Sequence, residues 1–320
     1  MPAPLRPAAP HTPAPHRLPW VWLGGLLLLT LVWDALGLDL PLMRHIGTPQ
    51  GFALRSDTLL EGVMHDGLRQ SALGLYLALW GWALVPDARL PARWRDRHPP
   101  RRERLAVVLL VAAALAAVNL VKQHSLTSCP WDLTLFGGPA RYVSHWSFGA
   151  ADGGSGRCFP GGHASSAFAL LPLCLPWLAP PVGSRGRDTA TGQRWLGGIL
   201  FVGVVAGTTQ TVRGAHFPSH TLWTLVLCGG VALTGWRLAQ PWLRAVAART
   251  QAPARRFAAT GSETDVGFCE TVQDHQAVLP QHPVELGLTH GARQVGVAAR
   301  QARLDAVHAA GGGREHHHDR

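Results

Sequence analysis

The side chains of this sequence best suited to chemistry lie in one short stretch, Arg213-Gly214-Ala215-His216-Phe217-Pro218-Ser219-His220, between two apolar runs. The stretch holds an arginine and two histidines without an acidic residue, a set suited to holding and attacking an anion. Pro218 is expected to end one helix and begin the next, because proline is tolerated in the first turn of a helix and not in its interior. The two histidines are therefore expected around a bend in the chain.

Three other segments could add groups to the same anion site. Gln210 is spaced by three residues from Arg213, and Arg213 by three from His216, so a continuous helix would place them on one face. Lys122, at the end of an apolar run, is the single lysine of the chain. Gly161-Gly162-His163 precedes another apolar run. Glycines ahead of a helix let backbone N–H groups close on an anion, and a histidine in the first turn could donate a proton to a leaving oxygen.

Six apolar runs of about 16 to 19 residues must position these groups. Each is near the lower end of what a helix needs to cross the hydrocarbon core of a bilayer. The runs are Trp20–Leu38, Gln70–Val85, Leu105–Val121, Ala164–Val182, Trp195–Val212 and Thr221–Trp236. The sequence therefore predicts an all-α fold, an integral membrane six-helix bundle with catalytic residues at the outer-face helix ends.

The placement of arginine predicts the orientation of this bundle. The loop 87–104 has seven arginines against three acids, and 237–256 has five arginines and no acid. The segment 39–69, by contrast, has three arginines against four acids. Because cytoplasmic loops of membrane proteins are enriched in basic residues, both termini are expected in the cytoplasm. The three chemical stretches then all face the periplasm or exterior.

The composition favours a membrane protein over a nucleic-acid-binding one. Of the 320 residues, 47% are hydrophobic and only 15% are charged. The net charge of +10 comes almost entirely from arginines in short loops between apolar runs, which is a topology signal and not a basic nucleic-acid surface. An arginine-rich, lysine-poor chain is also typical of a GC-rich bacterial genome. We therefore expect a bacterial inner-membrane protein that binds no nucleic acid.

The two ends of the chain differ in composition from the middle. Residues 1–19 are rich in proline, histidine and alanine and are expected to form a disordered cytoplasmic arm. Residues 20–242 contain the six spans and form the predicted membrane domain. Residues 243–320 lack a clean hydrophobic period and are expected to form a largely disordered cytoplasmic tail.

Taken together, the chemical stretches resemble the three motifs of the type-2 phosphatidic acid phosphatase superfamily, integral-membrane lipid phosphatases related to vanadium haloperoxidases. The family motifs are Lys-x6-Arg-Pro, Pro-Ser-Gly-His and Ser-Arg-x5-His-x3-Asp. This chain has Lys122-x6-Cys129-Pro130, then Pro160-Gly161-Gly162-His163, then Gln210-x5-His216-x3-His220. Their order, their spacing and their positions relative to the apolar runs agree with the family over roughly residues 20–240.

Four positions depart from the family pattern. Cys129 replaces an arginine that clamps phosphate, and Gly161 replaces a serine and so keeps only its backbone donor. Gln210 stands in an arginine position, while Arg213 lies one helical turn later and could reach the same phosphate. His220 replaces the aspartate that orients the nucleophile. A neutral imidazole can accept the N–H of His216 but brings no negative charge.

The resemblance implies roles for the matching residues. His216 would attack phosphorus and form a phospho-His intermediate, and His163 would protonate the leaving group and then help water to release phosphate. His220 would orient His216. Lys122, Arg213, Gln210 and the amides of Gly161 and Gly162 would bind the phosphate oxygens. The resemblance implies no metal and no cofactor, and its expected partners are a lipid phosphate and the bilayer.

Cys129 and Cys158 lie in the outward loop beside the first two motifs. An oxidising periplasm would allow a disulfide between them.

Three other functions remain open on the sequence. A phosphotransferase would pass the phosphoryl group of His216 to another lipid and not to water. A degenerate member of the family would bind or sense lipid phosphate without turnover. A metal-dependent hydrolase would use His216 and His220 as ligands, although no nearby acidic residue offers a base.

Overall fold

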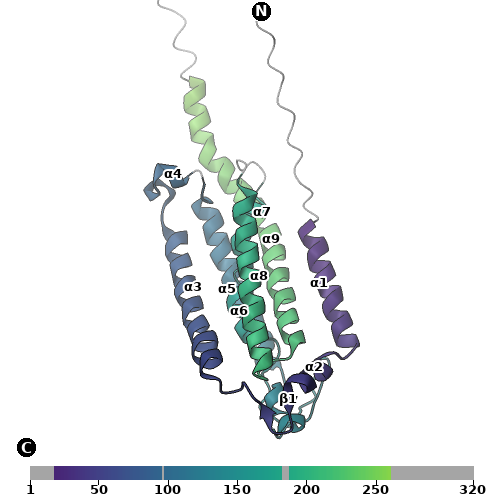
Figure 1. Ribbon diagram of the computed structural model, residues 1–320. Helices are drawn as coiled ribbons and strands as arrows, with labels where there is room; N and C mark the ends of the chain where they lie inside the picture. The colour runs from purple at the N-terminus through teal and green to yellow at the C-terminus, as the bar shows by residue number, and fades with distance from the viewer. Residues whose placement is uncertain (1–17, 96, 182–186, 261–320) are drawn as a thin grey trace, which may run out of the picture. The chain divides into compact units, whose positions relative to one another are not determined.

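The computed structural model describes residues 18–95, 97–181 and 187–260, and it is mostly helical (Figure 1). The predicted arm, apart from residues 18 and 19, and the predicted tail beyond Thr260 lie outside the described residues. The longer helices are α1 (Leu18–Ala35), α2 (Asp39–Ile46), α3 (Leu68–Leu84), α5 (Arg101–His124), α8 (Thr189–Val212) and α9 (Pro218–Thr260).

Shorter elements connect these helices. They are the two-stranded antiparallel pair β1 (Gly47–Thr48) and β2 (Gly51–Phe52), the π-helix η1 (Leu59–Gly67), the short α-helices α4 (Ala92–Arg95), α6 (Gly162–Phe168) and α7 (Leu175–Leu178), and the 3-10 turns η2 (Asp87–Arg89), η3 (Pro130–Asp132), η4 (Thr134–Phe136) and η5 (Leu171–Cys174).

Within the described residues, four helices are long and apolar enough to cross a membrane. They are α1, α5, α8 and the part of α9 over Pro218–Val246. These helices match the first, third, fifth and sixth predicted spans. The second predicted span corresponds to α3, which ends where Val85 becomes extended ahead of Pro86. The count of six spans stays a prediction.

The fourth predicted span is not one continuous helix. Residues 162–178 form three short pieces, α6, η5 and α7, in place of a single helix over Ala164–Val182. Pro172 and Pro176 stand at the starts of η5 and α7, and neither can donate the backbone hydrogen bond that a continuing α-helix requires. The length and hydropathy of this run predicted an apolar span but not its division at the two prolines.

One apolar core packs the helices together. Its members include Val107 and Val111 of α5, Phe168 of α6 and Trp236 of α9. α6 and α8 approach closely at Gly203, where an added Cβ would lie 2.0 Å from the ring of Phe168. A glycine is needed there because any side chain would overlap that ring. This close packing fixes the start of α6 against the long helices.

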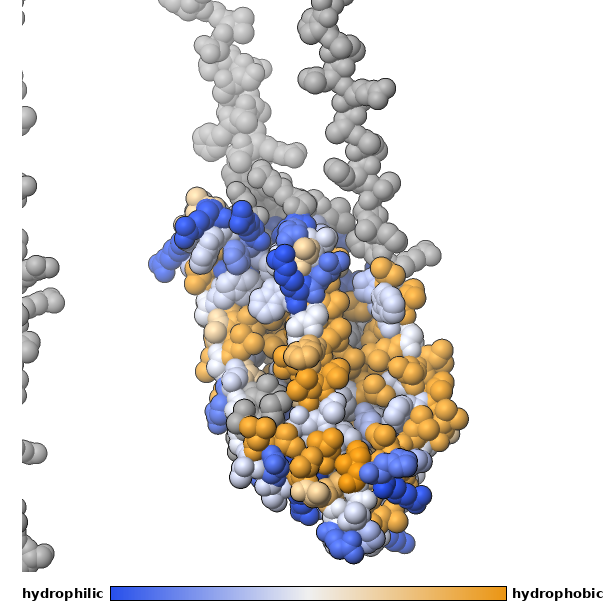
Figure 2. All heavy atoms as spheres, viewed as in Figure 1, coloured by the Kyte–Doolittle hydropathy of each residue, from blue (hydrophilic) through white to orange (hydrophobic). Residues whose placement is uncertain are grey.

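The outer surface of the bundle is apolar over the middle of its length. Figure 2 shows hydrophobic residues across the middle of this face and hydrophilic residues at its two ends. Large exposed side chains include Leu28 of α1, Leu109 of α5 and Phe201 of α8, which are 63%, 58% and 71% exposed. Exposed apolar surface of this extent is expected of a protein that faces lipid.

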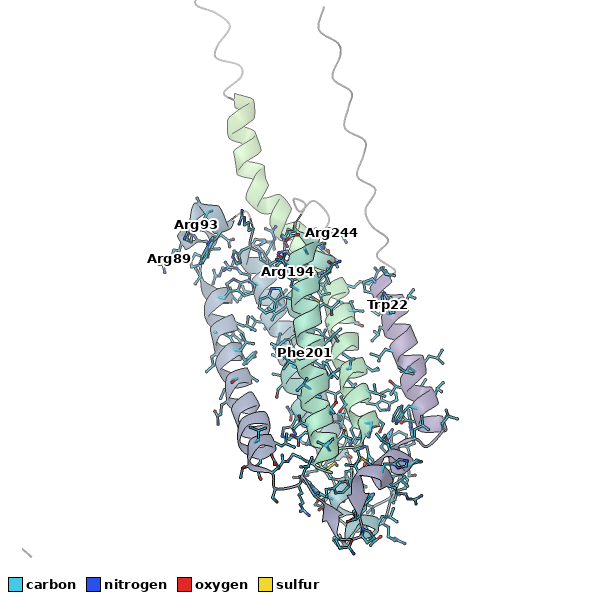
Figure 3. The ribbon with its side chains drawn as sticks, viewed as in Figure 1. Trp22, Arg89, Arg93, Arg194, Phe201 and Arg244 are labelled. Carbon is cyan, nitrogen blue, oxygen red and sulfur yellow. A yellow bond between two sulfur atoms is a disulfide. The ribbon has the colours of Figure 1, made fainter. Side chains whose placement is uncertain are left out.

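The two ends of the bundle have different contents. Arg89, Arg93, Arg194 and Arg244 lie near one end, and Phe201 lies halfway along α8 (Figure 3). The other end, where α5 finishes and α9 begins, carries a second apolar cluster, which we call the cap. Its buried members are Met43, Phe52, Leu133, Phe136, Ala140 and Phe217. The cap covers the bend between α8 and α9.

Candidate active site

The three segments with the motif residues meet at the capped end of the bundle. The chain after α5 runs beside the chain before α6, because the Arg157 amide donates to the Ser125 carbonyl at 2.8 Å and the Cys158 amide to the Thr127 carbonyl at 2.9 Å. Cys129 and Cys158, the pair singled out in the sequence, form a disulfide between these two segments. Lys122 is thereby brought to the start of α6.

The bend between α8 and α9 forms the other side of the site. The Gln210 carbonyl accepts the amides of Ala215 at 2.8 Å and His216 at 3.3 Å, which ends α8 in a tight turn. Gly214 adopts φ 76°, and an added Cβ would lie 2.2 Å from the Phe52 ring of the cap. A glycine is required at this position both by its positive φ and by the approach of that ring.

Three histidines cluster where these segments meet. The ring centroids of His163 and His216 are 5.9 Å apart, and those of His216 and His220 are 5.8 Å apart. His216 and His220 are buried, 4% and 1% exposed. The structure thus brings together the residues that match the second and third family motifs.

His216 is held in its neutral form. Burial lowers its pKa well below the usual 6.5, and the neighbouring His220, Lys122 and His163 lower it further. The charges that act on His216 from the described residues are all basic. A neutral imidazole keeps a ring lone pair for attack, and the basic surroundings favour an anion beside it.

Lys122 lies directly over the first residue of α6. Its Nζ is 3.3 Å from the position that a Cβ of Gly162 would occupy. Gly162 therefore leaves room for the ammonium group, and a larger residue would displace it. The phosphate-binding role predicted for Lys122 and Gly162 stays a prediction.

Arg213 has contacts that its predicted role as a phosphate ligand did not include. Its Nε and Nη2 donate to the Arg55 carbonyl at 3.1 and 2.9 Å, and Nη2 is 3.6 Å from Glu61 Oε1. One bidentate edge of the guanidinium is therefore occupied by the loop after β2. Arg213 fastens this loop to the bend, and it could bind phosphate only with its remaining donors or by exchanging these contacts.

The amide of Gly161 is also occupied, and its predicted role as a phosphate donor stays a prediction. It donates to the His220 carbonyl at 3.1 Å, while Thr224 Oγ1 donates to the Gly161 carbonyl at 3.0 Å. Gly161 thus joins the segment before α6 to α9. The sequence could not show this, because the partner carbonyl belongs to a helix about 60 residues away.

The Gln210 side chain is buried without a hydrogen-bond partner in the described part of the chain. Only 1% of the residue is exposed, and both its amide oxygen and its amide nitrogen lack partners. A buried unpaired carboxamide is costly unless water or a ligand satisfies it. Its predicted contact with phosphate stays a prediction.

The orienting role predicted for His220 stays a prediction. We expected His220 to accept the N–H of His216, but His216 Nδ1 faces Cys158 Sγ at 3.3 Å. The ring of His220 instead stands edge-on to Phe159 with centroids 5.2 Å apart, and edge-on to His145 at 6.0 Å. The sequence predicted only a disulfide for Cys158 and not this contact.

Two carboxylates near the site were not predicted to belong to it. Buried Asp39 accepts from the Ser219 amide at 3.1 Å and from the Ser219 hydroxyl, and it holds the start of α9. Asp34 Oδ2 accepts from His145 Nε2 at 3.1 Å and from Trp223 Nε1 at 2.8 Å. An acid in an otherwise apolar run was the signal that could have identified Asp34.

Asp34 and Asp39 also line a small hollow beside the histidine cluster. It is bordered by Tyr142 and His145 as well, and its lining includes none of His163, His216 and His220. The hollow therefore lies next to the cluster and is not the candidate catalytic position itself.

Comparison with known proteins identifies one family. Residues 104–244 match the model of the PAP2 superfamily. The matched segment includes Lys122, His163, His216 and His220, so the match covers every motif residue and confirms the family predicted from the sequence. No curated protein and no solved structure matches the chain significantly.

Proposed function

Because residues 104–244 of this chain belong to the PAP2 superfamily, whose members are generally phosphatases, we propose that the protein is a membrane lipid phosphate phosphatase. It hydrolyses a phosphomonoester or diphosphate of a lipid through a phospho-His intermediate on His216. The observation that carries this proposal is the basic cluster at the capped end. Buried, neutral His216 is surrounded there by Lys122, His163 and His220.

The first step is attack by His216. Its lone pair forms a bond to phosphorus as the bond from phosphorus to the leaving oxygen breaks, and His163 gives its proton to that oxygen. Lys122 neutralises charge on the equatorial oxygens, helped by Gly162, Gln210 and the free donors of Arg213. Removing one such donor typically costs about 2.7–4 kcal/mol of transition-state stabilisation.

The second step releases phosphate. His163, now neutral, takes a proton from water as the water attacks the phosphoryl group, and the bond between phosphorus and His216 breaks. No step requires a metal ion, so the proposal predicts turnover in the presence of a chelator. In their disulfide, Cys129 and Cys158 carry no thiolate that could bind a metal.

The position of the cluster supports a lipid substrate. Lys122 stands near the end of α5, and His216 and His220 flank the start of α9, two helices apolar enough to cross a membrane. A phosphate held at these helix ends would lie near the level of lipid headgroups. The bilayer is thus a partner of the reaction as well as of the fold.

The proposed location is a bacterial inner membrane, with both termini in the cytoplasm and the active site outside. Two observations support it. Arg89, Arg93, Arg194 and Arg244 gather at the end that would face the cytoplasm (Figure 3). The disulfide is near the opposite end, as an oxidising compartment would favour. Reporter fusions at the C-terminus that are active only in the periplasm would contradict this orientation.

The experiment that tests the function is phosphate release by purified protein from a panel of lipids. The panel includes phosphatidic acid, phosphatidylglycerol phosphate, undecaprenyl diphosphate and a lipid A phosphate. We expect release from at least one lipid, retained with chelator and abolished in His216→Ala. Phosphate release by His216→Ala at the wild-type rate would contradict the proposal.

The occupied donors of Arg213 and Gly161 favour one second candidate, a protein that binds lipid phosphate without turnover. The same panel separates it, because such a protein would bind a lipid phosphate and release nothing. Adding a second lipid alcohol as acceptor separates hydrolysis from phosphotransfer, since a phosphotransferase would yield a new lipid phosphate in place of free phosphate.

A further inference from the structure

The disulfide of the capped end touches the ring of His216. Cys158 Sγ lies 3.3 Å from His216 Nδ1. Cys129 Sγ, Cys158 Sγ and a ring nitrogen of His216 all lie within 4.8 Å of one another. Cys158 is fully buried and His216 is 4% exposed, so bulk water does not compete for this contact. The sulfur is therefore a fixed neighbour of one particular ring nitrogen.

The chemistry of a disulfide decides how this contact is made. A disulfide sulfur carries no hydrogen, so Cys158 Sγ can accept a hydrogen bond but cannot donate one. A hydrogen bond across this contact therefore requires the proton to be on Nδ1 of His216. In the neutral imidazole the other nitrogen, Nε2, is left with the lone pair.

Other groups near the ring are the Cys158 carbonyl, which also interacts with it, and the rings of His163 and His220. The rings of His163 and His220 are tilted by 51° and 59° to that of His216, with centroids almost 6 Å away. The Gln210 carbonyl is engaged by the backbone amide of His216 and not by its ring. Asp39 and Asp34, the nearby carboxylates, are held by Ser219 and by His145.

We propose that Cys158, as half of its disulfide with Cys129, is the positioning residue that sets the tautomer of the His216 nucleophile. This inference rests on the proposed function. With the proton on Nδ1, the Nε2 lone pair forms the bond to phosphorus while the bond to the leaving oxygen breaks and His163 protonates that oxygen. The Nδ1 proton stays in place, so the phosphorylated ring is a cation until water removes the phosphoryl group.

The proposal makes the site sensitive to redox conditions. Dithiothreitol would give two electrons and two protons to the disulfide and become a cyclic disulfide itself. The resulting Cys158 thiol can donate as well as accept, so it no longer requires the proton to be on Nδ1. Reduction is expected to slow phosphorylation of His216 by roughly fivefold to tenfold, the equilibrium factor of one net hydrogen bond.

A matched pair of variants separates positioning from mere tethering. Cys129→Ala/Cys158→Ala and Cys129→Ala/Cys158→Asp both lack the disulfide, but only the second keeps an acceptor that cannot donate when ionised. Each full-length variant is mixed with phosphatidic acid radiolabelled at phosphorus, or with the panel lipid that is turned over fastest. The protein is quenched in base, and the two phosphohistidine isomers are separated.

We expect wild type to carry the label on Nε2 of His216. The double-alanine variant should form the intermediate about tenfold more slowly, with part of the label on Nδ1, and the aspartate variant should restore the Nε2 isomer. Equal rates and isomer ratios in the two variants would overturn the proposal and leave the disulfide as a tether. Absence of label on wild-type His216 would instead overturn the proposed function.

If neither variant inserts into the membrane, wild type with and without dithiothreitol gives the same test. Unchanged isomer ratio and rate after complete reduction, verified by thiol labelling of Cys129 and Cys158, would overturn the proposal. A slower reaction with label shifting to Nδ1 would support it.

Discussion

At one end of the helical bundle the buried side chains of Glu103 and Arg104 meet opposite charges, whereas at the other end His216 is surrounded by basic neighbours. Glu103 and Arg104 open α5 and are fully buried. Both nitrogens at the tip of Arg187 donate to Glu103, and Arg104 Nη2 donates to Asp87 Oδ1 at 2.7 Å. At the capped end, His216 is surrounded by Lys122, His163 and His220.

This difference between the two ends distinguishes charges that stabilise the fold from charges that serve binding or catalysis. A buried pair that satisfies itself needs no ligand, and its removal affects folding. A group of basic side chains without a matching carboxylate is destabilising until an anion arrives, and proteins keep such groups where they bind or transform that anion. We therefore expect variants at the paired end to change stability and variants at the basic end to change activity.

The largest expected effect is at the centre of the basic end. His216→Ala removes the nucleophile and should lower phosphate release by at least about 10⁴-fold, as loss of a catalytic nucleophile does in other enzymes. The matched control is His124→Ala, because His124 is an exposed histidine at the end of α5 whose ring hydrogen-bonds to the Leu120 carbonyl of its own helix. Release assays on both variants check the prediction. Equal losses in the two variants would show that the assay reports protein quality and not chemistry.

Breaking the paired end should cost stability instead. Glu103→Ala leaves Arg187 and its neighbours with an uncompensated buried charge, which typically costs about 3–5 kcal/mol. The thermal unfolding midpoint in detergent should fall, while the activity of protein that remains folded should stay near wild type. If Glu103→Ala had normal stability and no activity, the expectation that the paired end serves stability would be contradicted.

Lys122→Met tests the opposite combination at the basic end. Loss of one phosphate donor should lower kcat about 10²- to 10³-fold. Stability should hold or rise, because the half-buried ammonium is no longer placed beside the buried histidines. Parallel kinetics and unfolding measurements check this, and a stability loss equal to that of Glu103→Ala would contradict it.

The pH dependence of stability gives a smaller effect with a definite sign. The pKa of His216 is below 6.5 in the folded chain because of burial and basic neighbours, so the unfolded chain binds more protons in the window between the two values. Its contribution to stability is therefore fully present above pH about 6.5 and is lost as the pH falls toward the folded pKa, by at most about 1.4 kcal/mol per pH unit. The free energy of unfolding should fall more steeply with decreasing pH in wild type than in His216→Ala, by up to about 1.4 kcal/mol per pH unit. The same pH dependence of the unfolding free energy in the two proteins would contradict this prediction.

The smallest effect is expected for an ion pair whose carboxylate is exposed. Arg213 and Glu61 are 3.6 Å apart, and the Glu61 side chain is 54% exposed. Glu61→Gln should change stability by less than about 1 kcal/mol, because water screens such pairs. A change as large as that of Glu103→Ala would show that exposure of the carboxylate does not separate these two pairs.

The sequence predicted which residues gather at the basic end better than it predicted their hydrogen-bond partners. Hydrophobic run lengths located the long helices because membrane spans must be long and apolar, and motif order located Lys122, His163 and His216. The breaks at Pro172 and Pro176 were also readable from the sequence. The partners of Arg213 and Gly161 were not, because they depend on how segments far apart in the chain fold together. The contact from Cys158 to His216 is of the same kind.

The covalent intermediate is the most direct test of the account. Purified protein is mixed with radiolabelled phosphatidic acid, or the most active panel lipid, and quenched in base, and the labelled peptide is mapped. We expect label on the peptide that contains His216, lost on a chase with unlabelled substrate and absent from His216→Ala. Phosphate release without label on His216, or label on another residue, would contradict it.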